Sequence, residues 1–311
     1  MDFISLSPQS KDLKTLAGPA WTLVLPAVTI GNVGQLAVDL FLTNGLCNHV
    51  GRLRAPAVLP VVGAAISPPA HRSSVLSAIE VYTVEGASAP IVLLQQRAPI
   101  APGLAPEHAQ AILDWAMEAG CTQILVLASA NAAGRRDAQL RTSSNGISNR
   151  LRIAATTAAF ERGSMAARAR DEFGWKAVEG PDSRGWAAEG DNMIDDDRIQ
   201  GTGAFPAFLP TSRRGAFVRS ILEYSDAKKF PTTSLLVFVH EGDNSGDAIV
   251  MASAASVLLG LRINAPGSTS ETDPAIASEE QNDPVLLACH LWQAPPLWKM
   301  LFAPPPPRGL Y

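Results

Sequence analysis

The segment GNVGQLAVDLFLTNGL, Gly31 to Leu46, decides the fold of this chain. It follows the apolar run WTLVLPAV (residues 21–28), which is typical of a strand. Within the segment, apolar residues recur at the i, i+3, i+4, i+7 and i+8 spacing of one helix face. These residues are Val33, Leu36, Ala37, Leu40 and Phe41, whereas Gln35 and Asp39 fall on the other side. The stretch therefore predicts a strand, a turn and a helix over about residues 33–44.

The residues at the two ends of this helix indicate how it starts and stops. Asn32 is a good N-cap residue, and Gln35 three positions later makes a loose capping box. We expect Gly31 to supply unusual backbone angles in the turn and Gly45 to close the helix. A nucleotide loop is not favoured, because GxGxxG is absent and no Lys-Ser/Thr follows the glycines. An anion at the bare helix N-terminus stays open as an alternative to a simple turn.

The same alternation of strands and helices recurs along the chain. The runs Ile79–Val84 and Ile91–Arg97 bracket EGASAP and predict a β-hairpin. A helix from Pro106 to Gly120 and the unbroken apolar run Thr122–Ser129 then complete a strand–helix–strand unit. Residues 214–224, 235–240 and 247–261 predict a helix, a buried strand and a helix. These patterns predict one α/β domain with a central, mostly parallel mixed sheet flanked by helices.

Two regions differ in composition and are expected to be loops within this domain. The first, about 177–213, opens with the acidic, Gly-rich stretch EGPDSRGWAAEGDNMIDDD, and the second covers about 264–284. We expect an N-terminal segment over 1–17, the α/β domain over 18–303 and a Pro-rich tail over 304–311.

Composition excludes several classes of protein. A net charge of −4 does not favour a nucleic-acid partner. The three cysteines are far apart without a CxxC pair, so a disulfide framework or zinc site is not expected and a reducing compartment is. The N-terminus does not read as a secretory signal. The uncharged run 15–38 is long enough to cross a bilayer, but Pro26, Gly31 and Asn32 interrupt it, so we predict no membrane span.

One group of residues could form an active site. Ser129 follows one predicted buried strand, and His240, Glu241 and Asp243 follow another, which places them where α/β sheets bind ligands. Ser, His and Asp there could form a nucleophilic triad. Against this, Ser129 lies in LASAN without a GxSxG elbow, and EGDN followed by Ser-Gly reads as a turn with a helix cap. We predict no catalytic residue, no metal and no cofactor.

Four stretches resemble, in chain order, the proteasome assembly chaperone 2 family: LPAVTIGNVGQLAVDLFL, LASANAAGRRDAQLR, LLVFVHEGDNSGDA and PLWKMLFAPPPPRGLY. The first and third are the most specific, because GNVGQLAVDL and EGDN followed by Asp are motifs of that family. The motif positions, with a structural or interface role, are Gly31, Asn32, Val33, Gly34, Gln35, Asp39, Glu241, Gly242, Asp243, Asn244 and Asp247.

The resemblance implies a non-enzymatic role. Members of the family pair with a proteasome assembly chaperone 1-type subunit, and the heterodimer binds α-subunits of the 20S proteasome and promotes formation of the α-ring. Their fold is an α/β domain related in shape to nucleoside phosphorylase-like proteins. We expect a cytoplasmic and nuclear location, with no nucleic-acid or membrane partner. An α/β hydrolase or phosphorylase-like enzyme using Ser129 and His240 stays open as the alternative.

Three surfaces are candidates for contacts with such partners. The resemblance implies that Leu310 and Tyr311 enter a pocket of the α-ring, although Tyr is last here and the docking motif places it second from the end. The apolar residues around Trp298 to Phe302 could supply a heterodimer interface, and part of the 33–41 helix could share in it. The basic stretch Arg135 to Arg152 could meet acidic α-subunit surfaces.

Overall fold

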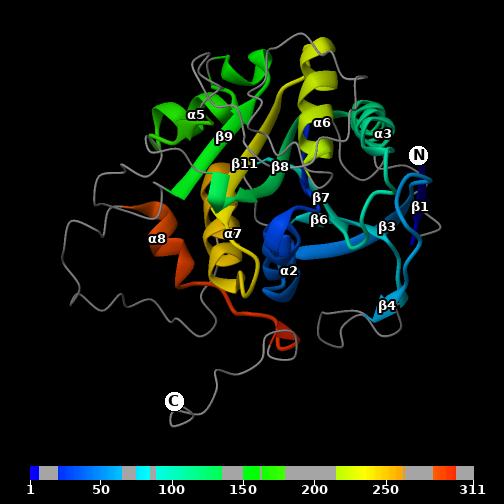
Figure 1. The fold of residues 1–311 in the computed structure, drawn as a ribbon, viewed down its shortest axis with the longest axis horizontal. Coiled ribbons are helices and arrows are strands. Elements are labelled where there is room, and N and C mark those ends of the chain that lie inside the picture. The colour runs from blue at the N-terminus through cyan, green and yellow to red at the C-terminus, as the bar shows by residue number, and fades with distance from the viewer. Residues whose placement is uncertain are drawn as a thin grey trace.

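The computed structural model describes residues 1–6, 20–64, 75–84, 89–134, 150–161, 163–178, 215–261, 263 and 283–298. These residues form a nine-stranded mixed sheet with helices on both faces (Figure 1). The order across the sheet is β1-β3-β6-β7-β2-β8-β11-β9-β10. The strands are β1 (Asp2–Ser5), β2 (Trp21–Pro26), β3 (Cys47–Arg54), β6 (Ile79–Val84), β7 (Ile91–Gln96), β8 (Cys121–Asn131), β9 (Leu151–Ala155), β10 (Lys176–Ala177) and β11 (Thr232–Val239). A separate short pair joins β4 (Gly63–Ala64) to β5 (Val75–Leu76).

The four central strands β7, β2, β8 and β11 are parallel to one another. On one side β6, β3 and β1 continue the sheet in antiparallel pairing, and on the other side β9 pairs antiparallel with β11 while β10 is parallel to β9. The predicted α/β fold and the predicted hairpin, which is β6–β7, are therefore confirmed. The first strand in the parallel group, β2, lies between β7 and β8, which are joined through a helix.

Helices cover the sheet on both faces. They are α2 (Val33–Thr43), α3 (Ala105–Glu118), α5 (Met165–Asp171), α6 (Ala216–Ala227), α7 (Ser245–Leu259) and α8 (Pro284–Cys289). Three-residue and four-residue 3-10 turns are η1 (Ile30–Asn32), η2 (Ala132–Gly134) and η4 (Thr157–Phe160). Among the described residues, no helix is long and apolar enough to cross a membrane.

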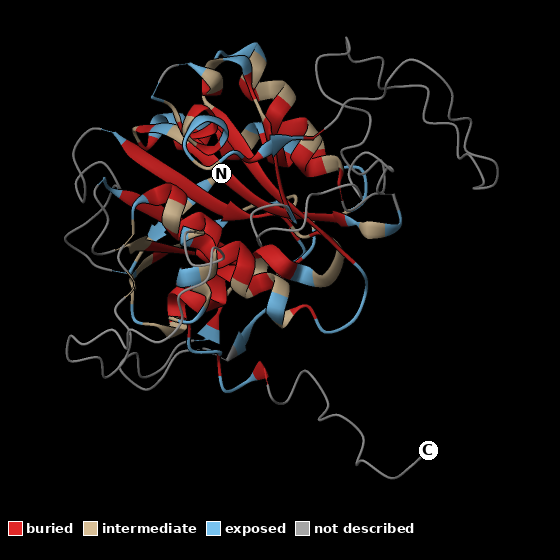
Figure 2. Ribbon diagram, turned by 90° about the vertical axis from the view of Figure 1, so that its left-hand side faces the viewer, coloured by how far each residue is buried: buried red, intermediate tan, exposed pale blue. Residues whose placement is uncertain are grey.

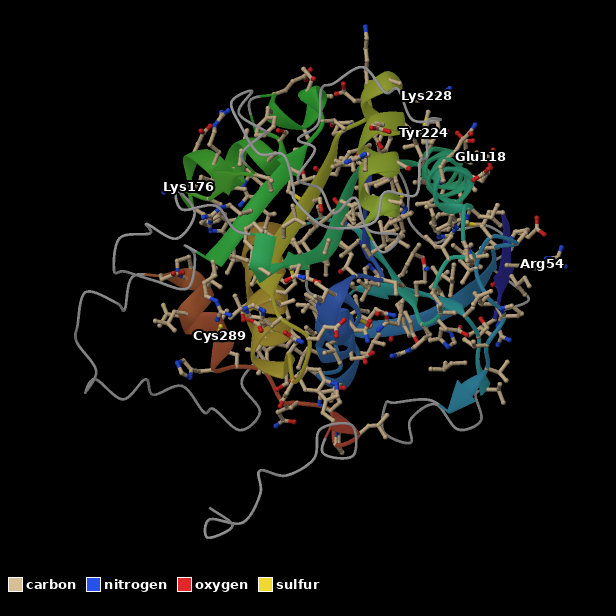
Figure 3. The ribbon with its side chains drawn as sticks, viewed as in Figure 1. Arg54, Glu118, Lys176, Tyr224, Lys228 and Cys289 are labelled. Atoms are coloured by element: carbon tan, nitrogen blue, oxygen red, sulfur yellow. The ribbon has the colours of Figure 1, made fainter. Side chains whose placement is uncertain are left out.

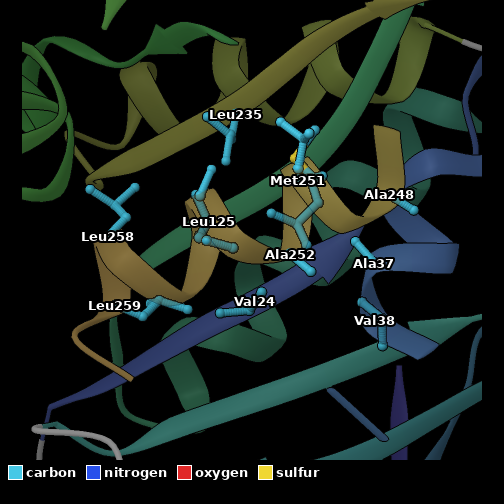
Figure 4. Packing of buried hydrophobic residues seen from close by; sticks show 14 of the residues in the cluster. Val24, Ala37, Val38, Leu125, Leu235, Ala248, Met251, Ala252, Leu258 and Leu259 are labelled. Atoms are coloured by element: carbon cyan, nitrogen blue, oxygen red, sulfur yellow. The ribbon is translucent and has the colours of Figure 1, made fainter. Parts of the chain in front are cut away.

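The core divides into two layers because side chains alternate along each buried strand. Val24, Leu125 and Leu235 belong to the cluster that α2, α7 and α8 cover (Figure 4). Their sequence neighbours Leu23 and Ile124 belong to the second cluster, under α3 and α6. Figure 2 shows the central strands buried along their length, as expected for parallel strands covered on both faces.

The opening segment forms the predicted strand, turn and helix, with one correction. Gly31 has φ +67°, and Gly45 has φ +71° with its amide donating to the carbonyl of Leu42, so both glycine predictions are confirmed. Asn32 does not cap the helix with its side chain. Its backbone is left-handed, at φ +52°, whereas a side-chain cap needs an extended N-cap residue.

The C-terminal part of the described chain is held against α2 and α7. Trp292 packs edge-on against Phe41 with 5.1 Å between ring centroids, and its indole N–H donates to Ser253 Oγ at 2.8 Å. Asn44 exchanges two hydrogen bonds of 3.0 Å with the backbone of Gln293. These contacts place residues 283–298 on the α7 side of the sheet (Figure 1).

Several predictions fall wholly or partly outside the described residues. The first predicted loop begins within the fold, because Ala177 is in β10 and Val178 is buried, but residues 179–213 are not described. The second predicted loop ends at Pro284, the first residue of α8, after the gap 264–282. The N-terminal segment is described only over residues 1–6, and residues 299–311 lie outside as well.

Candidate functional site

The two specific motifs of the sequence meet at one edge of the sheet. The strands β2, β8 and β11 are parallel, so their carboxyl ends lie at the same edge. Turn η1 follows β2, and the loop His240–Asn244 follows β11 and leads into α7. This edge is where open α/β sheets commonly bind ligands, so it is the first place to look for function.

The direct contact between the motifs is between Gly31 and Asn244. A Cβ atom on Gly31 would lie 2.4 Å from Asn244 Nδ2, so only glycine leaves room for the amide. The buried Asn244 side chain donates from Nδ2 to the carbonyls of His240 and Gly242, each at 3.0 Å. Asn244 thus holds the loop in shape, and Gly31 lets the loop approach the start of α2.

Ser129 joins this junction from the third strand; it lies within β8, paired with Val237, and not past the strand as predicted. Its hydroxyl donates to the carbonyl of Ile30 at 2.5 Å, and its amide donates to Thr29 Oγ1 at 3.0 Å. The two hydroxyls of Thr29 and Ser129 are 2.8 Å apart, and both side chains are buried. Ser129 therefore fastens η1 to β8.

The structure does not assemble the Ser129–His240 pair into a catalytic arrangement. The Ser129 hydroxyl is buried and occupied by Ile30, whereas His240 is exposed at the surface. Within the described part of the chain, no hydrogen bond joins Ser129 to His240. Asp243 accepts from the amide of Ser245 at 2.9 Å, which closes a turn just before α7, whose N-cap position is occupied by Asn244. The prediction that EGDN followed by Ser-Gly forms a turn into a helix is therefore correct, but no side chain caps that helix.

Gln35 and Asp39 of the first motif attach α2 to β7. The Gln95 amide donates to Asp39 Oδ1 at 2.7 Å and to the carbonyl of Gln35 at 2.9 Å. Gln35 in turn donates from Nε2 to the carbonyl of Gln96 at 2.8 Å. Arg97 contacts both Asp39 oxygens, at 2.7 and 3.0 Å. The two motif residues are therefore structural, and their partners all come from the end of a single strand.

Burial governs the electrostatics of this attachment. Burial raises the pKa of the Asp39 carboxyl, and the Arg97 guanidinium and the Gln95 amide offset part of that rise. The periodicity of α2 placed Asp39 on a polar side facing away from the core, which is wrong: nine residues of α2 are buried, Asp39 among them. Val33 is also buried. A buried carboxylate is stable here because a guanidinium and an amide bind it.

The exposed part of the junction is small and contains two acids. Asn32, Glu241, Gly242 and Asp243 are exposed at the surface. Asp247 in the first turn of α7 forms an ion pair with Arg150, which immediately precedes β9. Asp247 therefore joins α7 to the described end of the basic stretch. Of that stretch, residues 135–149 are not described, and Arg152 is buried.

Sequence reasoning missed four residues of this site: Thr29, Gln95, Gln96 and Arg97. For Gln95, Gln96 and Arg97 the signal in the sequence was the polar ending QQR of the apolar strand IVLLQQR. For Thr29 it was a hydroxyl shortly after β2. The predicted tail contacts Leu310 and Tyr311 lie outside the described residues. Among the residues that the structure describes, no group of three or more His, Cys, Asp or Glu side chains could hold a metal ion.

Comparison with known proteins gives matches over most of the chain. A family model described as the PAC2 family matches residues 23–272. The chain is 30% identical over 247 residues to proteasome assembly chaperone 2 of Nematostella vectensis, covering 78% of this chain and 90% of that protein. It is 26% identical over 309 residues to proteasome assembly chaperone 2 of Homo sapiens, covering 98% and 99% of the two chains.

Solved structures share the fold at low sequence identity. Pyrococcus furiosus PbaA, an archaeal homologue of proteasome-assembly chaperone, superposes with a TM-score of 0.51 at 11% identity, over 85% of this chain and 88% of that one. Pyrococcus furiosus PbaB, an archaeal proteasome activator, also has a TM-score of 0.51, at 15% identity, over 85% and 90%. The match to the family model and the identity to relatives along most of the domain establish that the chain belongs to the PAC2 family.

Proposed function

We propose that this chain is a non-enzymatic chaperone for assembly of the 20S proteasome. In this proposal it forms a heterodimer with a proteasome assembly chaperone 1-type chain, and the pair binds α-subunits and promotes α-ring formation. The observation that carries the proposal is the alignment with the human relative named proteasome assembly chaperone 2, which covers 98% of this chain and 99% of that one. A match of that extent includes the whole α/β domain.

The geometry of the motif junction supports a binding role over a catalytic one. Gly31, Asn244 and Ser129 use their hydrogen-bonding and steric properties to hold the loops together. A nucleophile needs a free hydroxyl within reach of its base, and Ser129 and His240 do not have that arrangement. The exposed acids Glu241 and Asp243 suit contact with a protein surface. Gly34 lies against the carbonyl of Leu127 and Asp247 pairs with Arg150, so both contact other parts of the domain.

The proposal includes the tail and the location. We propose that Leu310 and Tyr311 contact the α-ring. Trp298, the last described residue, is 4% exposed and packs in the cluster under α2 and α7. The tail therefore starts from a fixed point on the α7 side of the domain. The proposed location is the cytoplasm and the nucleus, where proteasome precursors would be met.

The test is affinity purification of a tagged copy from its own cells at about 0.1 M salt, where surface ion pairs are only partly screened. Mass spectrometry then identifies the co-purifying proteins. We expect a second chaperone and α-subunits with the intact chain. A variant that lacks residues 309–311 should keep the second chaperone and lose α-subunits. The matched control places the tag before Met1 in both forms, so that the last residue is free.

Each result bears on a different part of the proposal. If neither a chaperone nor α-subunits co-purify with the intact chain, the chaperone role is wrong. If the shortened chain retains α-subunits in full, docking by Leu310 and Tyr311 is wrong, although the chaperone role stands. Substituting Ser129 by Ala and measuring the same co-purification addresses the enzymatic alternative, because a scaffold needs no nucleophile.

A further inference from the structure

Large apolar side chains are exposed mainly at one end of the sheet. Ten large hydrophobic residues in the described chain are at least 36% exposed. Six of them lie on or just after β1, just before β4 or on β5, and we call this group the β1-end surface. Its members are Ile4, Leu6, Leu59, Val61, Val62 and Val75, with exposures from 42% to 77%. Figure 1 places β1, β3 and β4 together at the end of the sheet away from β9.

We infer that the β1-end surface is the site where this chain binds the second PAC2-family chain of its heterodimer. The inference rests on the proposed function, and it names the surface that the proposed pairing uses.

The chain that carries the surface is fixed to the domain at its base. The Leu59 amide donates to the carbonyl of Pro99 at 3.1 Å, and the buried Val58 forms a β-bridge with Ile100. On β1, the ring of Phe3 lies against Gly51, where a Cβ atom would come within 2.5 Å of it. The exposed side chains therefore project from an anchored backbone, and binding would not have to order them first.

The two edges of the sheet differ in how they are protected. The far edge, β10, has two residues, Lys176 and Ala177, and a short edge strand with an exposed lysine is a typical guard against strand pairing. The near edge, β1, has four residues and is followed by Leu6, and its Ile4 and Leu6 are about half exposed. Figure 3 shows Lys176 and Arg54 at these opposite ends.

The low charge of this surface favours a partner protein that presents an apolar contact surface. Residues 55–64 and 75–79 contain no Asp, Glu, Lys, Arg or His. Arg54 and Asp2 bind each other at 2.5 Å, and the partly buried Arg52 is the cross-strand neighbour of Ile4. A nucleic acid would need free cations, and this surface offers none in those ranges. A low-charge apolar centre with a polar margin is the composition of a protein–protein interface.

The exposed area is sufficient for the centre of a stable heterodimer. Taken together, the six exposures equal about three complete side chains, or on the order of 300 Å² of apolar surface at roughly 100 Å² each. One side of a standard interface buries about 800 Å², of which about 450 Å² is apolar. The β1-end surface therefore supplies most of the apolar area that one partner needs.

Within the part of the chain that the structure describes, the other candidate surfaces for this contact are buried or dispersed. The 33–41 helix is α2, and nine of its residues are buried under the C-terminal segment and against the sheet. Trp298, which sequence reasoning offered as an exposed anchor, is buried. The remaining exposed hydrophobics of the described chain are dispersed: Leu104 and Met117 lie at opposite ends of α3, Leu287 lies on α8 and Leu297 follows α8.

The test is a binding measurement between this chain and the co-expressed second chaperone, with paired variants. Val62→Glu with Val75→Glu places two charges at the most exposed positions, 77% and 63% exposed. Met117→Glu with Leu287→Glu makes the same chemical change at positions that are 45% and 54% exposed elsewhere. We expect at least about a tenfold loss of affinity for the first pair and little change for the second, because central apolar positions carry most of an interface's energy.

The outcomes separate this inference from the proposed function. If the unmodified chain binds and both variant pairs bind equally well, the inference is wrong and the heterodimer stands. If the unmodified chain fails to bind any second chaperone, the proposed pairing is wrong and this inference falls with it. If the first pair abolishes self-association of the chain alone and spares the heterodimer, the surface joins two copies and the assigned partner is wrong. Val62→Ser with Val75→Ser repeats the test without charge, should the glutamates impair folding.

Discussion

Gly34 is the residue at which a single methyl group should most directly disturb the fold. A Cβ atom there would lie 2.3 Å from the carbonyl oxygen of Leu127 on β8, whereas carbon–oxygen contacts are normally about 3.3 Å or longer. Helix α2 would have to move by about 1 Å from the sheet to accept alanine. The same carbonyl accepts the Ala27 amide at 2.8 Å, so that hydrogen bond is strained as well.

The effect of Gly34→Ala on the free energy of unfolding can be compared with that of the same substitution at Gly246. Overpacking costs about 1–3 kcal/mol and a weakened hydrogen bond about 1 kcal/mol, while helix propensity returns about 1 kcal/mol to alanine. We expect a net loss of about 1–3 kcal/mol in the free energy of unfolding. Gly246 is likewise the second residue of its helix, α7, but has nothing within 4 Å of its Cβ position. Gly246→Ala should therefore be neutral or stabilising by up to about 1 kcal/mol.

The assay is urea unfolding of the two variants beside the unmodified protein, followed by tryptophan fluorescence and circular dichroism. The expected difference between the variants is about 1–4 kcal/mol, and both probes should report the same transition. Equal stabilities within about 0.5 kcal/mol would show that α2 does not approach β8 as closely as described, and the steric argument would be wrong.

Three further predictions concern buried polar groups. Burial lowers the pKa of His108 to about 4 from an ordinary 6.5, so the unfolded chain binds the proton first as pH falls. The free energy of unfolding should drop by roughly 3 kcal/mol between pH 6.5 and 4, and pH-dependent denaturation of His108→Leu should show a flatter profile there. Arg97→Met removes the guanidinium that pairs with the Asp39 carboxylate and should lower the free energy of unfolding by about 3–5 kcal/mol. The double variant Arg97→Met with Asp39→Asn should recover part of that loss. Losses that simply add in the double variant would contradict the pairing. Ser129→Ala should lower the free energy of unfolding, measured in urea, by about 1–3 kcal/mol. Co-purification of partners should not change. Loss of partners with unchanged stability would argue against a structural role for Ser129.

The predictions that succeeded from sequence are those that depend on local pattern. The apolar spacing of α2, the unbroken apolar runs of β8 and β11 and the two sides of the β6–β7 hairpin all act within a few residues of each other. Backbone geometry and side-chain direction impose these periods on any chain. The left-handed backbone at Gly31 could be foreseen for the same reason, since glycine lacks the Cβ that disfavours it.

The arrangement of the candidate site depended on contacts between distant parts of the chain. Asp39 lies 56 and 58 positions from its partners Gln95 and Arg97, and Ser129 lies 100 positions from Thr29. No local spacing encodes which strand ends beside which helix, because β2 pairs with β7 and β8, which lie far from it along the chain.

The amino-acid sequence by itself determined the α/β class, the start of α2 and the family resemblance, because periodicity, turn chemistry and motif letters are properties of contiguous residues. Only the tertiary structure decided that Gln35 and Asp39 are buried attachments, that Ser129 is a structural hydroxyl and that the exposed apolar residues gather at the β1 end. The physical reason is that burial and hydrogen-bond partners belong to the packed chain. A residue's role at this site is therefore set by which strand lies next to it in space.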